Sequence, residues 1–263
     1  MENKFFGLFI GINTYFDPLD FKDRRKELSS PSYDATSLST AFGHFFRNLK
    51  NHIEIVTEQN LDYRPTKNEL WAKIYKISKS INRNDLFVLY FAGHGATLEN
   101  QLHLYPSDFD GRVPIESSIN LNSIINIVSQ NVKKKIFICD CCRSFIDNDT
   151  SVESSKFKFQ SPLFFIDEDT YIINACSNGQ YSYEMYGIEK ETLCRGVFSY
   201  FLEKALKSIN KEDVTLYDIF SYTREKTSEW VANVLSKHQV PILHGGNSSD
   251  WYIFPEPENK KII

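Results

Sequence analysis

Short apolar runs recur along the chain, separated by longer segments that mix apolar and polar residues. The runs lie at Phe5–Ile12, Ile53–Val56, Leu86–Phe91, Ile136–Cys139 and Tyr171–Ile173. Short continuous apolar runs are typical of parallel strands that are buried on both faces of a sheet. We therefore predict a strand at each run.

The segments between and after these runs have helical spacing. In the second of them, Leu70, Ile74 and Ile77 recur on one helical face. We predict helices at Pro31–Phe46, Thr66–Ser80, Leu121–Val128, Gly196–Ser208 and Thr215–Leu235, and a last short strand at Trp251–Phe254. Alternation of strands and helices predicts an α/β sandwich with a mostly parallel central sheet flanked by helices.

Two connections are rich in turn and polar residues, Asp17–Ser30 and Asp147–Ser161. Loops of this length inside a compact domain are usually functional or disordered. The chain contains no internal repeat, heptad array or low-complexity tract. We therefore predict a single domain that spans residues 1–263.

The composition narrows the class of protein. With 41% hydrophobic and 24% charged residues, the chain is an ordinary globular protein. Its net charge of −4 provides no global basic field, so we expect no nucleic-acid partner.

No apolar stretch approaches the roughly 18 residues of a membrane span, and no secretory cleavage site follows the first apolar run. The five cysteines are an odd number, and three of them crowd together at Cys139, Cys141 and Cys142. Because neighbouring cysteines bridge each other poorly, a reducing compartment fits best. We expect a cytoplasmic protein without a membrane contact.

Two of the predicted strands end in reactive residues. One runs into Gly93-His94-Gly95, and the other runs into Asp140-Cys141-Cys142. Ligands of an open parallel sheet bind beyond the carboxyl ends of its strands, so a histidine and a cysteine there share one crevice. An imidazole beside a thiol favours the nucleophilic thiolate, and backbone N–H groups stabilise the oxyanion that forms after attack.

The order and spacing of the motifs resemble the caspase and metacaspase clan of cysteine peptidases. His94 precedes Cys142 by 48 positions, close to the roughly 50-residue offset of the caspase signature. The other matching motifs are GIN-x-Y at Gly11–Tyr15, Asp34-Ala35, YFAGHG, DCCRS, NACSNGQ-x-S-x-E at Asn174–Glu184 and RGVFSYFLEKAL at Arg195–Leu206. The resemblance implies a caspase-like three-layer sandwich and a prokaryotic caspase-like protein.

The resemblance also assigns roles to individual residues. Cys142 becomes the nucleophile and His94 the general base, and the N–H groups of Gly95 and Cys142 form the oxyanion hole. Metacaspases place an Asp two residues before the nucleophile and another at the start of the first helix, which here are Asp140 and Asp34. Carboxylates around a narrow pocket favour Arg or Lys before the scissile bond, and Glu184 adds to their charge.

The chain departs from the family pattern in places. Arg143-Ser144-Phe145 follows the nucleophile where metacaspases commonly have His-Ser-Gly, and Ala92 stands where they often carry a pocket serine. The acids Asp147, Asp149, Asp167, Glu168 and Asp169 are most simply a solvated loop. We therefore predict no metal site and no cofactor, and calcium activation stays open.

The segment around Asp147–Ser161 matches the part of the chain that clan members cut during maturation. We expect a large-subunit-like part at 1–146, a linker at 147–169 and a small-subunit-like part at 170–263. Lys156 and Lys158 are candidate autocleavage sites for a basic-specific peptidase. The expected function is a cysteine endopeptidase acting on proteins in antiviral defence or regulated death, controlled by an activating or inhibiting partner.

Other interpretations of the same residues stay open. Cys141 rivals Cys142 as the nucleophile, whereas Cys139, Cys176 and Cys194 are better explained as buried small side chains. A zinc site at these cysteines is disfavoured, because zinc ligands usually come as spaced pairs on turns. Asp34 is equally well explained as a helix-start residue. At the level of function, the alternatives are a silent caspase-homologous interaction module and a thiol amidase that acts on small molecules.

Overall fold

The computed structural model describes residues 3–16, 27–58, 64–141, 163–164, 166–190, 192–208 and 214–245. Its centre is a six-stranded sheet in the order β11-β8-β7-β3-β1-β2. The strands are β1 (Lys4–Gly11), β2 (Lys50–Thr57), β3 (Leu86–Gly93), β7 (Lys134–Cys141), β8 (Thr170–Asn174) and β11 (Ile242–Gly245). All neighbouring pairs run parallel except β11 with β8, which is antiparallel.

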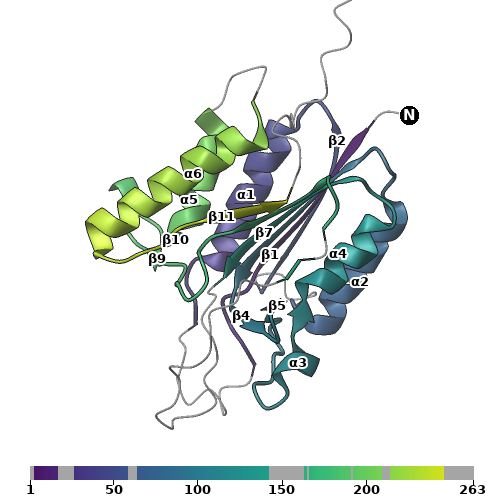
Figure 1. Ribbon diagram of the computed structural model, residues 1–263, viewed down its shortest axis with the longest axis horizontal. Coiled ribbons are helices and arrows are strands. Elements are labelled where there is room, and N and C mark those ends of the chain that lie inside the picture. Colours follow the sequence, from purple (N-terminus) through teal and green to yellow (C-terminus); the bar gives the residue numbers. More distant parts are fainter. Residues whose placement is uncertain are drawn as a thin grey trace, which may run out of the picture.

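Helices cover both faces of this sheet (Figure 1). One face is covered by α1 (Pro31–Phe45), α5 (Val197–Ser208) and α6 (Leu216–Trp230), and the other by α2 (Lys67–Ser80) and α4 (Leu121–Ser129). The predicted three-layer α/β sandwich with a mostly parallel sheet is confirmed.

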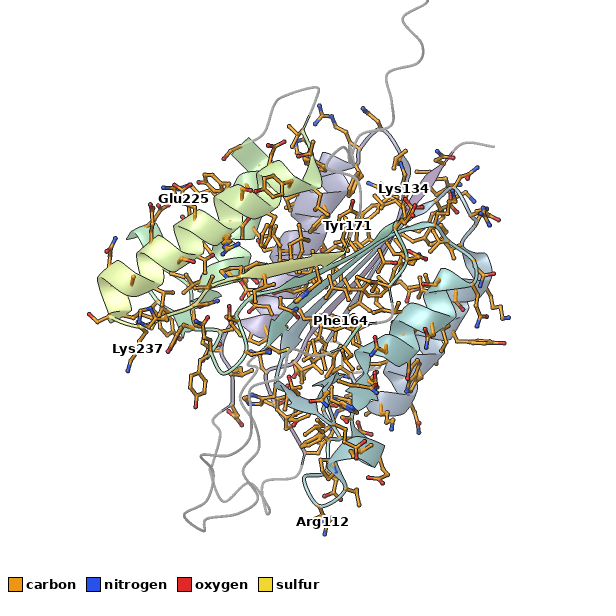
Figure 2. All side chains as sticks on the ribbon, in the orientation of Figure 1. Arg112, Lys134, Phe164, Tyr171, Glu225 and Lys237 are labelled. Carbon is orange, nitrogen blue, oxygen red and sulfur yellow. The ribbon has the colours of Figure 1, made fainter. Side chains whose placement is uncertain are left out.

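The alternation of side chains along each strand explains why the strands are apolar throughout. In β1, Phe5 and Phe9 pack in one core layer, whereas Phe6, Leu8 and Ile10 pack in the other. Both sets are at most 5% exposed. Figure 2 shows side chains filling the space on both sides of the sheet. A strand buried on both faces needs apolar residues at successive positions, which is the pattern seen in the sequence.

Local sequence signals set several helix boundaries. The Thr66 side chain accepts a hydrogen bond from the backbone N–H of Glu69 at the start of α2. Thr215 and Asp218 form a reciprocal capping box at the start of α6. The helix predicted at Thr215–Leu235 is present, and its last turn, Val231–Leu235, is a π-helix.

In the C-terminal third, two elements differ from the predictions, and one predicted strand lies outside the described residues. The helix predicted from Gly196 starts at Val197, because β10 (Arg195–Gly196) pairs with β9 (Glu184–Met185). The segment around His244, where no strand was predicted, forms β11 at the sheet edge. The strand predicted at Trp251–Phe254 lies outside the described residues.

A small sheet lies beyond the carboxyl end of β3. It consists of β4 (Gly95–Leu98), β5 (Gln101–Leu104) and β6 (Ile119–Asn120), with the short helix α3 (Pro114–Ser117) before β6. His103 lies in this hairpin, where it pairs with Ala96. In the described ranges, no helix has both the length and the apolar character needed to cross a bilayer.

Candidate active site

The carboxyl ends of β3 and β7 lie side by side in the central sheet. Gly93 pairs with Cys141, so His94 directly follows this pair on one strand. Cys142 follows Cys141 in the sequence and lies outside the described residues. The strand register therefore brings His94 next to the strand that leads into the predicted nucleophile.

A small cavity of about 40 Å³ lies beside His94. Three parts of the chain line it: the segment before α1, the ends of β3 and β7, and the segment around β9 and β10. The lining residues are 28, 30–31, 92–94, 140–141, 182–184 and 196. Two of the three acids predicted from the sequence, Asp140 and Glu184, belong to this wall.

Asp140 is buried and held by two hydroxyl groups. Ser182 donates to one carboxylate oxygen over 2.5 Å, and Ser199 of α5 hydrogen-bonds to the other. Ser199 is in turn 2.6 Å from the phenol oxygen of Tyr90 on β3. Burial raises the pKa of Asp140, and the two serine hydroxyls oppose this rise. The carboxylate thus has a fixed orientation at the cavity wall.

Asp34 lies behind the cavity rather than in its wall. Its carboxylate accepts a hydrogen bond from Nε of Arg195 at 2.6 Å and another from the backbone N–H of Gly196 at 2.7 Å. Burial raises the pKa of Asp34 to about 7, although Arg195 opposes the rise. A Cβ on Gly196 would lie 2.9 Å from Asp140 and 3.0 Å from Asp34, so Gly196 alone separates the two acids.

Glu184 lies in the cavity wall and also holds the segment before α1. Its carboxylate accepts the backbone N–H groups of Ser29 and Ser30, each at 3.0 Å. Because α1 begins at Pro31, this negative charge also lies favourably near the positive end of a helix. Glu184 therefore lies in the cavity wall and also anchors the segment before α1.

His94 is half-buried and packs against Tyr15 of the segment after β1. The backbone N–H of His94 donates to the Tyr15 hydroxyl at 2.7 Å, and the two rings lie 4.9 Å apart. A Cβ on Gly93 would lie 2.7 Å from the same hydroxyl. The glycine before His94 therefore allows this tyrosine to approach the strand end.

Gly95 lies equally close to its surroundings. A Cβ there would come within 2.8 Å of the His103 carbonyl oxygen and 3.0 Å of the Cys141 sulfur. No larger residue fits this position without a shift of backbone. The oxyanion role of Gly95 and Cys142 stays a prediction.

The described cysteines are buried. Cys139, Cys176 and Cys194 are buried, as predicted. Cys141 is buried too, and it packs in the core layer of α2 and α4. Burial raises the pKa of Cys194 to about 11. The burial of Cys141 weakens it as a rival nucleophile. The candidate cleavage sites Lys156 and Lys158, like Cys142, lie outside the described residues.

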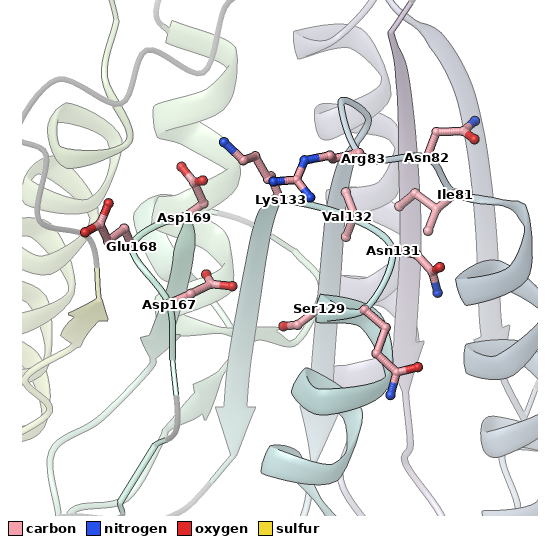
Figure 3. A pocket seen from close by; sticks show the side chains of 11 residues that line it. Ile81, Asn82, Arg83, Ser129, Asn131, Val132, Lys133, Asp167, Glu168 and Asp169 are labelled. Atoms are coloured by element: carbon pink, nitrogen blue, oxygen red, sulfur yellow. The ribbon is translucent and has the colours of Figure 1, made fainter.

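The acidic run at Asp167–Asp169 lies at the opposite end of the sheet from His94, where it lines a cavity of about 630 Å³ together with Arg83 and Lys133 (Figure 3). Asp167 is more than the solvated residue expected from the sequence. Its carboxylate pairs at 2.8 Å with Lys135, which is fully buried. Within the described ranges, no group of three or more His, Cys, Asp or Glu side chains is arranged to hold a metal ion.

Three polar residues at the site received no role from the sequence: Ser182, Ser199 and Arg195. All three lie inside motifs that carry the family resemblance, NACSNGQ-x-S-x-E and RGVFSYFLEKAL. The family motifs therefore include these residues, but they do not reveal which acid each residue contacts.

Most of the chain also matches known proteins. A family model described as "Caspase domain" (Peptidase_C14) matches residues 5–251. Metacaspase-1 of Plasmodium falciparum (isolate 3D7) is 23% identical over 198 residues. The aligned region is 68% of this chain and 30% of that relative, so the chain spans less than a third of the relative's length.

Proposed function

The chain belongs to the caspase-domain family of peptidases, and we propose that it is a cysteine endopeptidase that cleaves proteins after Arg or Lys. The observation that carries the proposal is the pairing of β3 with β7. It brings His94, the strand leading into Cys142, and a cavity walled by Asp140 and Glu184 to one edge of the sheet. A nucleophile, a base and a charged pocket are what such a peptidase requires.

In the proposed mechanism, His94 helps to generate the Cys142 thiolate, which attacks the scissile carbonyl carbon. The N–H groups of Gly95 and Cys142 stabilise the resulting oxyanion. His94 then gives its proton to the leaving amine, and a thioester remains on Cys142. Water hydrolyses this acyl-enzyme and restores the thiol. No organic cofactor takes part in these steps.

The preference for a basic side chain rests on the charges around the cavity. Asp140 and Glu184 line it, whereas Asp34, behind Gly196, is already paired with Arg195. Arg195 is buried in ion pairs with Asp34 and Glu203, so its charge is already matched by carboxylates. An ammonium or guanidinium group in the cavity is therefore attracted, and a substrate carboxylate is repelled.

The test is hydrolysis of matched fluorogenic peptides that end in Arg, Lys, Asp or Gln, with and without calcium. We expect cleavage after Arg and Lys only, and its complete loss in Cys142→Ala. The matched control is Cys141→Ala, which removes the neighbouring buried thiol and should retain activity. Equal loss in both variants would leave the nucleophile undecided, and cleavage after Asp would overturn the charge argument.

Control of the peptidase is a second part of the proposal. Lys156 and Lys158 fit the proposed specificity, so we expect cleavage after one of them during maturation. Mass spectrometry of wild type and Cys142→Ala tests this step, because only the active protein should be cut. An uncut wild type that still hydrolyses peptides contradicts it.

The resemblance to prokaryotic caspase-like proteins supports a cytoplasmic effector of defence or regulated death that a partner protein switches. Expression of wild type and Cys142→Ala in a bacterial host challenged with phage tests this role. Protection by the wild type alone is the expected result.

A further inference from the structure

Asp140 stands at the centre of a buried chain of hydrogen bonds that the proposed mechanism does not use. One oxygen is bound by Ser182 at 2.5 Å and the other by Ser199. Each serine has a second polar group behind it. Tyr90 lies 2.6 Å from the Ser199 hydroxyl, and Nε2 of Gln239 lies 3.0 Å from the Ser182 hydroxyl.

When Asp140 is ionised, the chemistry of these groups sets the direction of the hydrogen bonds around it. The Gln239 side-chain oxygen accepts the N–H of Tyr183 at 3.1 Å, and its nitrogen donates to the Ala175 carbonyl at 3.0 Å. The amide nitrogen therefore donates to Ser182, which leaves the Ser182 proton for Asp140. An ionised Asp140 likewise accepts from Ser199, so Tyr90 donates to Ser199.

We propose that Ser199, backed by Tyr90, is a positioning residue that keeps the Asp140 carboxylate ionised and oriented for the basic side chain of a substrate. The inference rests on the function proposed above and adds a specificity-determining residue to it. Ser199 and Tyr90 are both fully buried, and neither lines the cavity. They therefore act on the substrate only through Asp140, whereas Ser182 lies in the cavity wall.

The surroundings of Asp140 favour its neutral form, so hydrogen-bond donors are needed to keep it ionised. Burial and the negative charge of Glu184 both favour the neutral form of Asp140. Asp34 of α1 is another acid behind Gly196, and Arg195 of β10 is engaged by Asp34 and Glu203. His94 lines the same cavity. With Arg195 committed to Asp34 and Glu203, the hydroxyl donors Ser182 and Ser199 stabilise a charged Asp140.

The experiment compares wild type with Ser199→Ala, Ser199→Thr and Tyr90→Phe on an Arg-ending peptide from about pH 5 to 8. For Ser199→Ala we expect KM to rise about tenfold and kcat to change less than about twofold. The acid limb of kcat/KM should move to higher pH, because losing a donor makes Asp140 harder to ionise. Ser199→Thr keeps the hydroxyl and should restore both values, and Tyr90→Phe should show a smaller shift in the same direction.

A matched control separates this effect from loss of any buried hydroxyl. Thr223→Val removes a fully buried hydroxyl that donates only to the Ile219 carbonyl within α6. It should leave KM and the pH profile unchanged. Asp140→Asn supplies the reference in which Asp140 no longer titrates, so adding Ser199→Ala to it should cause no further shift of the pH profile.

Binding of agmatine, a small guanidinium compound, provides a readout that does not depend on catalysis. We expect calorimetry to give a dissociation constant about tenfold higher for Ser199→Ala than for wild type. If wild type cleaves no basic peptide, the proposed function fails, and that failure is visible without any variant. Unchanged KM, pH profile and agmatine affinity in Ser199→Ala overturn the positioning role. Should Ser199→Ala not fold, an unshifted Tyr90→Phe overturns it instead.

Discussion

The guanidinium Nε of Arg195 lies 2.6 Å from a carboxylate oxygen of Asp34, although 161 positions separate the two residues in the chain. The other side of the guanidinium fork reaches Glu203 on α5 at 2.5 Å. Its carbon lies 5.0 Å from the centre of the Tyr33 ring. This buried cluster fastens β10 to α1, and the adjacent Gly196 thereby lies against the two acids.

Arg195→Met should destabilise the fold by about 3–5 kcal/mol, because it leaves the Asp34 carboxylate buried without its cation. Burial already raises the pKa of Asp34 to about 7. Without Arg195 the folded-state pKa of Asp34 rises further, so the deficit relative to wild type should grow as the pH rises above about 7. Urea unfolding of the variant and wild type at several pH values measures this loss of stability. Lys226→Met, at an exposed ion pair on α6, should cause no measurable loss.

Gly196→Ala tests the tight space between the acids. The new methyl group would lie 2.9 Å from Asp140 and 3.0 Å from Asp34, so one carboxylate must move. We expect a loss of about 1–3 kcal/mol in stability, as for other overpacked sites. Turnover of an Arg-ending peptide should fall at least about tenfold, since displaced catalytic and binding groups lose rate steeply.

Gly111→Ala is the matched control, because nothing lies within 4 Å of its added Cβ. Stability and turnover should both stay at the wild-type level. If Gly196→Ala behaves like Gly111→Ala, the separation of Asp34 and Asp140 does not depend on the missing side chain.

Asp167→Asn should weaken the fold at neutral pH only. Lys135 and Thr170 hold the pKa of Asp167 below its usual range despite the opposing effect of burial. Because the folded-state pKa is lowered, the stabilisation is present above about pH 4 and disappears as the pH falls through the folded value. Asp167 is 53% exposed, so screening limits the loss to about 1 kcal/mol at pH 7.

Urea unfolding of Asp167→Asn and wild type at neutral and strongly acidic pH gives the two differences to compare. Asp169→Asn is the neighbouring control, because it removes an adjacent carboxylate and leaves the pair of Lys135 and Asp167 in place. A difference that persists undiminished in acid means that the Lys135 pair is not its source.

Thiol labelling should single out Cys142. Cys194 has a pKa of about 11, so less than about 0.1% of it is thiolate near pH 7.5. Cys139, Cys141 and Cys176 are at most 2% exposed. We therefore expect iodoacetamide to modify one residue rapidly and the others slowly. Peptide mapping identifies the site, and Cys142→Ala should abolish the rapid phase while Cys194→Ala retains it. Rapid labelling of Cys141 in the folded protein contradicts the assignment.

Much of the fold follows from local patterns. The strand at Leu86–Gly93 and the helix at Lys67–Ser80 lie where apolar runs and helical spacing predict them. The strand at Ile242–Gly245 escaped prediction, because it is short and lies between Pro241 and a glycine pair. It forms because β8 offers an unpaired edge, which no local pattern reveals.

The sequence alone identified the chemistry at the strand ends: a histidine between glycines, a cysteine cluster and the acids Asp34, Asp140 and Glu184. The histidine and the cysteines follow from residue types at the ends of predicted strands, whereas the roles of the acids follow from the family resemblance. Only the tertiary structure decided what each acid does, since Asp34 pairs with Arg195, Glu184 binds the N–H groups before α1, and Asp140 lies between two serines. The partners come from segments up to 162 positions away. Whether a carboxylate is paired, free or held by hydroxyls depends on packing across the sheet and not on its neighbours in the chain.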